Sequence, residues 1–115
     1  MTGRAVPKTP SDLLQGTVDV LILRTLAWEP MHGYAISRWI DEHTDGVIAV
    51  DGAALYQALH RLERRRLIAS TWGISENNRK AKYYKLTTRG RAELRSESAV
   101  WRSYADAVGK LLSTG

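Results

Sequence analysis

The sequence predicts an α+β fold that is mostly α, with three helices, a two-stranded β-hairpin and one long C-terminal helix. Three observations support this prediction. Apolar residues recur at helical spacing in three segments before residue 66, two strand-like runs flank a turn-forming stretch, and apolar residues between 94 and 111 recur every seven positions. Three helices followed by a hairpin is the order of a winged helix-turn-helix, in which the hairpin is called the wing.

Composition and charge narrow the class of protein. A chain of 115 residues is expected to form one domain, and without cysteine it has no disulfide, cysteine zinc site or thiol nucleophile. This composition fits a reducing compartment, so we expect a cytoplasmic protein. The net charge of +5 favours an anionic partner. The apolar run from Val18 to Leu23 contains Asp19 and is too short to span a membrane, so no membrane association is expected.

The first half of the chain is expected to contain an arm and two helices. Residues 1–11 include glycine and prolines without apolar periodicity, which indicates a flexible basic arm. The segment from Thr17 to Ala27 is apolar almost all round and predicts a buried helix with Thr17 as its N-cap. An amphipathic helix is expected after Pro30. We assign residues 12–87 to the winged helix-turn-helix domain and residues 88–115 to a C-terminal dimerisation helix.

The third helix, expected from Asp51 to Arg66, has a basic outer side. Its leucines, Leu55, Leu59 and Leu62, cluster on one side at 100° per residue, and Asp51 can cap its start. The hairpin is expected from strands 67–72 and 82–87, with basic residues at or near its tip. Together these features predict that the partner is double-stranded DNA. The candidate DNA-binding residues are Ala54, Tyr56, Gln57, His60, Arg61, Arg64, Arg65, Arg79, Lys80 and Lys82.

Different roles are expected within this set. The Gln57 amide can both donate to and accept from adenine in the major groove, and Arg61 suits either guanine or a phosphate. The remaining cations of the set are expected to neutralise phosphates, which adds affinity but little sequence information. An alternative function is a winged-helix module that binds protein and has only non-specific affinity for DNA.

The long C-terminal helix is expected to form a homodimer. Its apolar residues spaced seven apart form a seam that needs a partner, and this candidate interface comprises Leu94, Trp101, Tyr104, Val108 and Leu111. Trp101 has two interpretations, dimer core or stacking around a small aromatic effector. Trp28 could line the same space, although packing is its default role. Trp101 and Trp28 are therefore the candidate effector-binding residues.

Three segments resemble the PadR family of transcriptional regulators in its short form. They are "LLQGTVDVLILRTLAWEPMHGYAI", "LYQALHRLERR" and "RKAKYYKLTTRG". The resemblance implies a homodimeric DNA-binding regulator, usually a repressor, that dimerises through its C-terminal helix. Many such proteins respond to small, often aromatic, molecules.

The third helix departs from the family pattern. The family usually has Gly-Ser-Leu-Tyr-Pro at its start, where this chain has Ala53-Ala54-Leu55-Tyr56-Gln57. Gln57 replaces the usual proline, so the DNA sequence preference is expected to differ from that of relatives. Arg66 stands where the family tends to have the glycine that ends this helix in a left-handed turn. A residue other than glycine is expected to cost about 1 kcal/mol there unless the helix ends differently.

Enzymatic chemistry has little support in the sequence. No Ser-His-Asp or paired-carboxylate arrangement is evident, and no glycine-rich phosphate loop follows a strand. His43 and His60 lack acidic or histidine partners at metal-ligand spacing. We therefore expect no enzyme activity, no metal and no cofactor.

Overall fold

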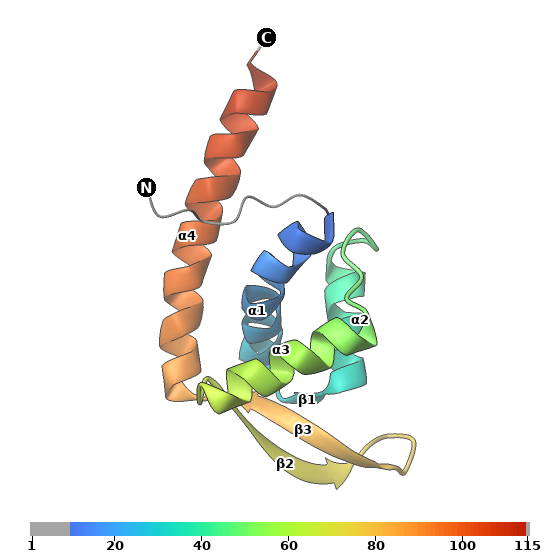
Figure 1. The fold of residues 1–115 in the computed structure, drawn as a ribbon. Coiled ribbons are helices and arrows are strands. Elements are labelled where there is room, and N and C mark those ends of the chain that lie inside the picture. Colours follow the sequence, from blue (N-terminus) through green and yellow to red (C-terminus); the bar gives the residue numbers. More distant parts are fainter. Residues whose placement is uncertain (1–9, 115) are drawn as a thin grey trace.

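The structure is a computed structural model that describes residues 10–114. Its elements in chain order are α1 (Pro10–Trp28), β1 (Met31–His32), α2 (Gly33–His43), α3 (Gly52–Arg64), β2 (Ile68–Ile74), β3 (Lys80–Leu86) and α4 (Thr88–Ser113). Helices α1, α2 and α3 pack together, the sheet lies at one end of them, and α4 runs beside α1 before projecting beyond the other helices (Figure 1). The predicted mostly helical fold with a wing and a long C-terminal helix is confirmed.

The hydrophobic core lies between the first three helices and the inner side of the sheet. The fully buried aliphatic side chains come from the three helices, the α3–β2 junction and β2, and they include Ile22, Leu23, Ile36, Leu55, Leu59, Leu62, Leu67 and Ile68. The predicted apolar side of α3 therefore packs inward, which leaves its polar side facing solvent.

The starts of three helices are fixed by side-chain caps. The backbone N–H of Ala54 donates to the Asp51 carboxylate at 2.9 Å, and the N–H of Gly90 donates to the Thr87 hydroxyl at 3.0 Å. His32 caps α2 in the same way, since its Nδ1 accepts from the N–H of Ala35 at 3.2 Å. The predicted Asp51 cap is thus confirmed.

The predicted start of the first helix at Thr17 is wrong. Helix α1 begins at Pro10, so Thr17 lies inside it and not at its start. Proline fits a first helical turn because the N–H that it lacks would have no helical partner there, and residues 11–15 contain nothing that stops a helix. The predicted arm, residues 1–11, otherwise falls outside the described residues, and its last two positions belong to α1.

The sheet has one strand more than predicted, and the hairpin strands are longer. The short strand β1 pairs with β3 through Met31 and Tyr84, giving the antiparallel order β1-β3-β2. Two residues are too few to give an alternating pattern, so β1 left no signal in the sequence. Strands β2 and β3 pair from Ile68 opposite Leu86 to Ile74 opposite Lys80, which shortens the predicted turn of residues 73–81 to residues 75–79.

Helix α3 ends in a left-handed turn at Arg66, whose φ is +63°. The N–H of Leu67 donates to the Leu62 carbonyl at 3.0 Å, and the N–H of Arg66 donates to the Glu63 carbonyl at 2.9 Å. This pair of bonds, together with burial of both Leu62 and Leu67, is a Schellman motif. The helix therefore ends where a glycine-containing relative would end it, with an arginine in the strained position.

Replacing Arg66 with glycine is expected to raise the free energy of unfolding by about 1 kcal/mol, because glycine adopts a positive φ without the Cβ clash. Urea denaturation at fixed protein concentration measures the change. Arg65→Gly is the matched control, since it also removes one arginine but from a right-handed residue with φ of −80°. An equal gain in both variants would show that loss of charge, and not relief of strain, is responsible.

The junction between α3, β2 and α4 is closely packed. The Thr87 hydroxyl shares its one hydrogen between the Arg66 carbonyl at 2.8 Å and the Leu67 carbonyl at 3.0 Å, and the Thr87 N–H also donates to the Leu67 carbonyl at 3.1 Å. Gly90 lies directly over the same carbonyl, where a Cβ would approach to 2.0 Å. These contacts fix the direction in which α4 leaves the domain.

Candidate DNA-binding surface

The outward side of α3 presents most of the predicted DNA-binding residues to solvent. Tyr56, Gln57, His60 and Arg64 are exposed, whereas Ala54 is half-buried and packs against the core. Their orientation follows from Leu55, Ala58, Leu59 and Leu62 on the opposite side of the helix, which are buried. The structure thus brings together a glutamine, a histidine and an arginine on one exposed helix face.

Tyr56 combines exposure with a packing role. Its side chain is 55% exposed, yet its ring and hydroxyl lie against the backbone of Gly33 at the start of α2, where an added Cβ would meet the hydroxyl at 2.6 Å. The glycine therefore allows the close approach of α3 to α2. Packing accounts for one part of the ring, and the rest faces solvent beside Gln57.

The Arg61 guanidinium is already paired with a carboxylate. It lies 2.6 Å from Asp19 on α1, and both side chains are about one-third exposed. The sequence predicts that Arg61 contacts a base or a phosphate, and it gives no sign of a pairing with Asp19. The ion pair joins α3 to α1, so Arg61 has a structural partner that DNA would have to displace or share.

Glu63 connects α3 to the wing. The Ser70 hydroxyl of β2 donates to Glu63 at 2.5 Å, and the Lys82 ammonium of β3 lies 3.4 Å from the other carboxylate oxygen. The Ser70 hydrogen bond, followed by the Lys82 charge, lowers the pKa of Glu63 below its usual value of 4.5. The folded state therefore favours the ionised carboxylate, and this stabilisation is present above pH 4.5 and is lost as the pH falls through the lowered pKa.

The other basic candidates lie around the end of α3 and along the wing. Arg65 pairs with Glu93 of α4 at 3.3 Å, with its side chain half exposed. Arg79 lies in the turn of the hairpin and Lys80 begins β3, and both are exposed. Arg64, Arg79 and Lys80 have no carboxylate within 4 Å in the part of the chain that the structure describes, so no ion pair within that part neutralises their charges.

Sequence reasoning missed an exposed aromatic residue on the wing. Trp72, on β2, is 64% exposed. The Lys80 ammonium lies 5.0 Å from the centroid of its ring. The sequence did not indicate this exposure. Strand alternation shows which residues share a face of the hairpin, but it does not show how far along the strand that face is covered by the core.

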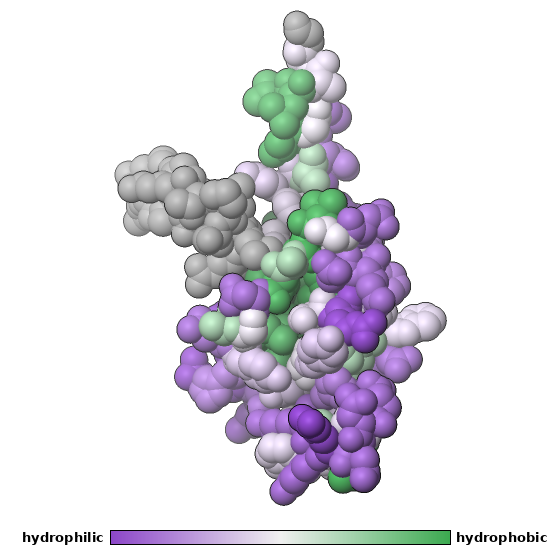
Figure 2. All heavy atoms as spheres, turned by 90° about the vertical axis from the view of Figure 1, so that its right-hand side faces the viewer, coloured by the Kyte–Doolittle hydropathy of each residue, from purple (hydrophilic) through white to green (hydrophobic). Residues whose placement is uncertain are grey.

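The apolar residues of α4 divide into an inner and an exposed group. Leu94 packs against the core of its own protomer, and Trp101 is half-buried with its ring centroid 5.7 Å from that of Tyr104. Tyr104, Val108 and Leu111 are exposed, as are Val100 and Leu112. Figure 2 shows apolar side chains gathered on the projecting end of α4, above a largely hydrophilic lower part of the molecule.

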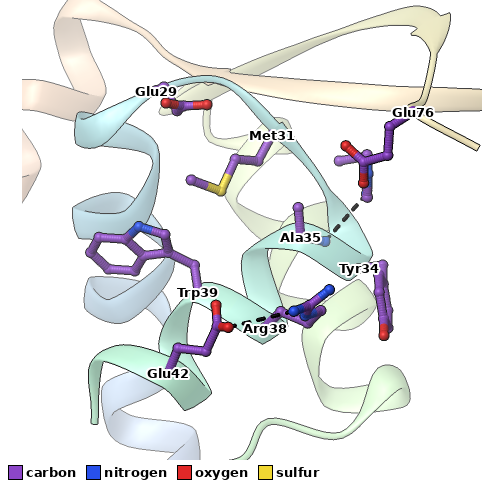
Figure 3. A pocket seen from close by; sticks show the side chains of 9 residues that line it. Glu29, Met31, Tyr34, Ala35, Arg38, Trp39, Glu42 and Glu76 are labelled. Carbon is purple, nitrogen blue, oxygen red and sulfur yellow. Dashed lines mark hydrogen bonds and ion pairs between the residues drawn. The ribbon is translucent and has the colours of Figure 1, made fainter. Parts of the chain in front are cut away.

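The candidate effector residues do not meet within the described chain. Trp28 ends α1 next to the sheet and is 65% exposed, whereas Trp101 lies thirteen residues into α4, about 20 Å of helical rise from its start. A shallow cavity of about 220 Å³ does exist elsewhere, between α2 and the wing tip, and neither tryptophan lines it. Figure 3 shows Trp39 at one side of this cavity, Glu76 of the wing at the other, and the Arg38–Glu42 ion pair along its edge.

Between residues 10 and 114 no group of three histidine, cysteine, aspartate or glutamate residues could hold a metal ion. No described helix is long and apolar enough to cross a membrane.

The fold and this basic surface define a winged-helix DNA-binding protein. The model of the transcriptional regulator PadR-like family matches residues 22–96, and the chain belongs to that family. The predicted family resemblance is confirmed, and the protein is a DNA-binding transcriptional regulator.

Individual relatives agree with this assignment. The chain is similar to a PadR family transcriptional regulator from Eggerthella lenta, with 36% identity, a TM-score of 0.74, and coverage of 91% of this chain and 89% of that one. A transcriptional regulator from Clostridium thermocellum has 30% identity and a TM-score of 0.77, covering 86% and 96%. An uncharacterized protein from Lysinibacillus sphaericus is 31% identical over 85% of this chain and 90% of its own length.

Proposed function

We propose that the protein acts in the cytoplasm as a homodimeric repressor that binds a pseudo-palindromic operator. The observation that carries this proposal is the exposure of Gln57 and Arg64 on the outward side of α3 together with the exposed Lys80 on the wing. A two-fold dimer would place two copies of α3 in successive major grooves, about one helical turn of DNA apart. Bound near a promoter, such a dimer excludes polymerase.

Within each protomer the exposed residues have different tasks. Gln57 donates to and accepts from a base edge, with adenine as its best partner. Arg64, Arg65, Arg79 and Lys80 bind phosphates, and His60 and the exposed edge of Tyr56 lie on α3 with Arg64. Arg61 and Lys82 hold α3 to α1 and to the wing through carboxylates, so they position the surface as well as adding to its charge.

The exposed apolar face of α4 is the proposed dimer interface. Tyr104, Val108 and Leu111 would meet their symmetry mates, and the half-buried Trp101 lies at the inner end of this face. An aromatic effector stacked near Trp101 would release DNA if it bound more tightly to a dimer with the wrong spacing between its α3 helices.

Alanine variants of Gln57 and Arg64 test the assignment of roles. An operator is first obtained by selecting the tightest binders of the wild-type protein from random-sequence DNA. Gln57→Ala is expected to weaken binding to this operator about 10- to 100-fold and to leave binding to scrambled DNA unchanged. Arg64→Ala is expected to weaken both, and to reduce the slope of log K against log salt by about 0.9.

Fluorescence anisotropy across a salt series measures the affinity of each of the two variants for the operator and for the scrambled DNA. The protein-interaction alternative predicts that neither variant changes a weak and unselective affinity. An unaltered base preference of Gln57→Ala at every operator position would contradict the role given to Gln57.

A further inference from the structure

Two arginines of α3, three positions apart, differ in whether a carboxylate neutralises them. The Arg61 guanidinium donates to the Asp19 carboxylate of α1 at 2.6 Å, and the two side chains are 35% and 30% exposed. Arg64 has no carboxylate within 4 Å among the described residues. DNA therefore meets a full positive charge at Arg64, but an arginine with a carboxylate beside it at Arg61.

The Asp19 charge acts differently on the two groups that an arginine can bind in DNA. A phosphate that approached Arg61 would also approach Asp19, and the repulsion between these two anions would oppose the contact. The O6 and N7 atoms of guanine are uncharged acceptors, so they meet much less of this repulsion. The ion pair thus makes guanine the better partner for Arg61.

The bond to Asp19 also orders the guanidinium without using all of its donors. A guanidinium has five N–H donors in one plane, and the bond to Asp19 is made from one terminal nitrogen, Nη2. Because Asp19 belongs to α1, it ties the Arg61 side chain to a second helix before any DNA is bound. A side chain that is already ordered loses less conformational entropy on binding.

The position of Arg61 on α3 indicates which base it would reach. Arg61 lies four residues after Gln57, about 6 Å further along the helix axis, and residues four apart are neighbours on a helix surface. We propose that Asp19 is a positioning residue that directs Arg61 to a guanine one or two base pairs from the base that Gln57 reads, and away from phosphates. This proposal rests on the proposed function, since it requires α3 to lie in a major groove.

Replacing Asp19 with asparagine tests this role. Asp19→Asn keeps the shape of the side chain and removes its charge, so Arg61 is released to bind a phosphate. On the selected operator, the preference for guanine at this position is expected to fall about 10- to 100-fold, while the preference at the base read by Gln57 is kept. The slope of log K against log salt is expected to become steeper by about 0.9 on operator and scrambled DNA alike.

Two further variants separate the effect of the pair from the effect of net charge. Asp106→Asn makes the same substitution at an exposed position of α4, so it changes the net charge equally and is expected to bind both DNAs as the wild type does. The double variant Asp19→Asn with Arg61→Gln removes both charges of the pair and keeps the net charge. It is expected to lose the guanine preference and to keep the wild-type salt slope.

Anisotropy on the operator, on operators with this guanine replaced and on scrambled DNA measures these effects, and circular dichroism checks that each variant folds. A folded Asp19→Asn variant with wild-type guanine preference would overturn the proposal. So would an equal loss of affinity for all DNAs with an unchanged salt slope, which would give Asp19 a structural role alone. A selected operator without a guanine within two base pairs of the Gln57 position would also overturn it. Failure of the wild type to select any operator would instead count against the proposed function.

Discussion

Replacing Gly90 with alanine is expected to destabilise the protein by about 3 kcal/mol, the largest effect of a single methyl group in this fold. The new Cβ would lie 2.0 Å from the Leu67 carbonyl oxygen and 2.8 Å from Leu86 Cδ1. The carbonyl cannot move freely, because it accepts hydrogen bonds from both the hydroxyl and the N–H of Thr87. Either α4 shifts away from the domain or the junction loses its hydrogen bonds.

Urea denaturation of Gly90→Ala beside Gly109→Ala checks this expectation. Gly109 is also inside α4, but a Cβ there meets nothing within 4 Å, so alanine should stabilise the helix by up to about 1 kcal/mol. The two identical substitutions in one helix are thus expected to have opposite signs. Equal stability of the Gly90→Ala variant and the wild type would mean that the junction is looser than the structure has it.

Introducing a charge on the exposed apolar face of α4 is expected to weaken operator binding about 10²- to 10⁴-fold. Val108→Asp would bury a carboxylate against its symmetry mate, so the protomers would separate and each α3 would bind its half-site without the effective concentration that the dimer provides. Analytical ultracentrifugation measures the dissociation, and anisotropy on full and half operators measures its consequence.

Ala99→Asp is the control for that variant. Ala99 is exposed and nine residues from Val108, which places it on the opposite side of α4 at 100° per residue. It is expected to remain dimeric and to bind the full operator normally. Val108→Asp that stays dimeric at micromolar concentration would contradict the proposed interface, and circular dichroism confirms that both variants remain helical.

The sequence predicted the elements that have strong periodicity or a capping residue. The inward side of α3 and the Asp51 cap could both be predicted. Buried leucines repeat every three to four residues along α3, and a carboxylate is common at the position before a helix. The left-handed residue at Arg66 was predicted only through the family resemblance, since arginine itself gives no sign of a positive φ.

The features that sequence reasoning missed depend on contacts between residues distant in the chain. Asp19 and Arg61 are 42 positions apart, so their ion pair follows from the packing of α1 on α3 and from no local pattern. The exposure of Trp72 likewise depends on where the hairpin passes the end of the core. Both features alter the candidate surface. Arg61 is already paired with a carboxylate, and Trp72 adds an exposed apolar side chain.

The most direct test of DNA recognition compares the fragment upstream of the protein's own gene with a scrambled fragment, by anisotropy across a salt series. Such regulators often control their own genes, which makes this fragment the best first operator. We expect the native fragment to bind about a thousandfold more tightly at physiological salt, with an affinity that falls steeply as salt rises. Equal and weak binding to both fragments, with no consensus from random-sequence selection, would contradict sequence-specific regulation by this surface.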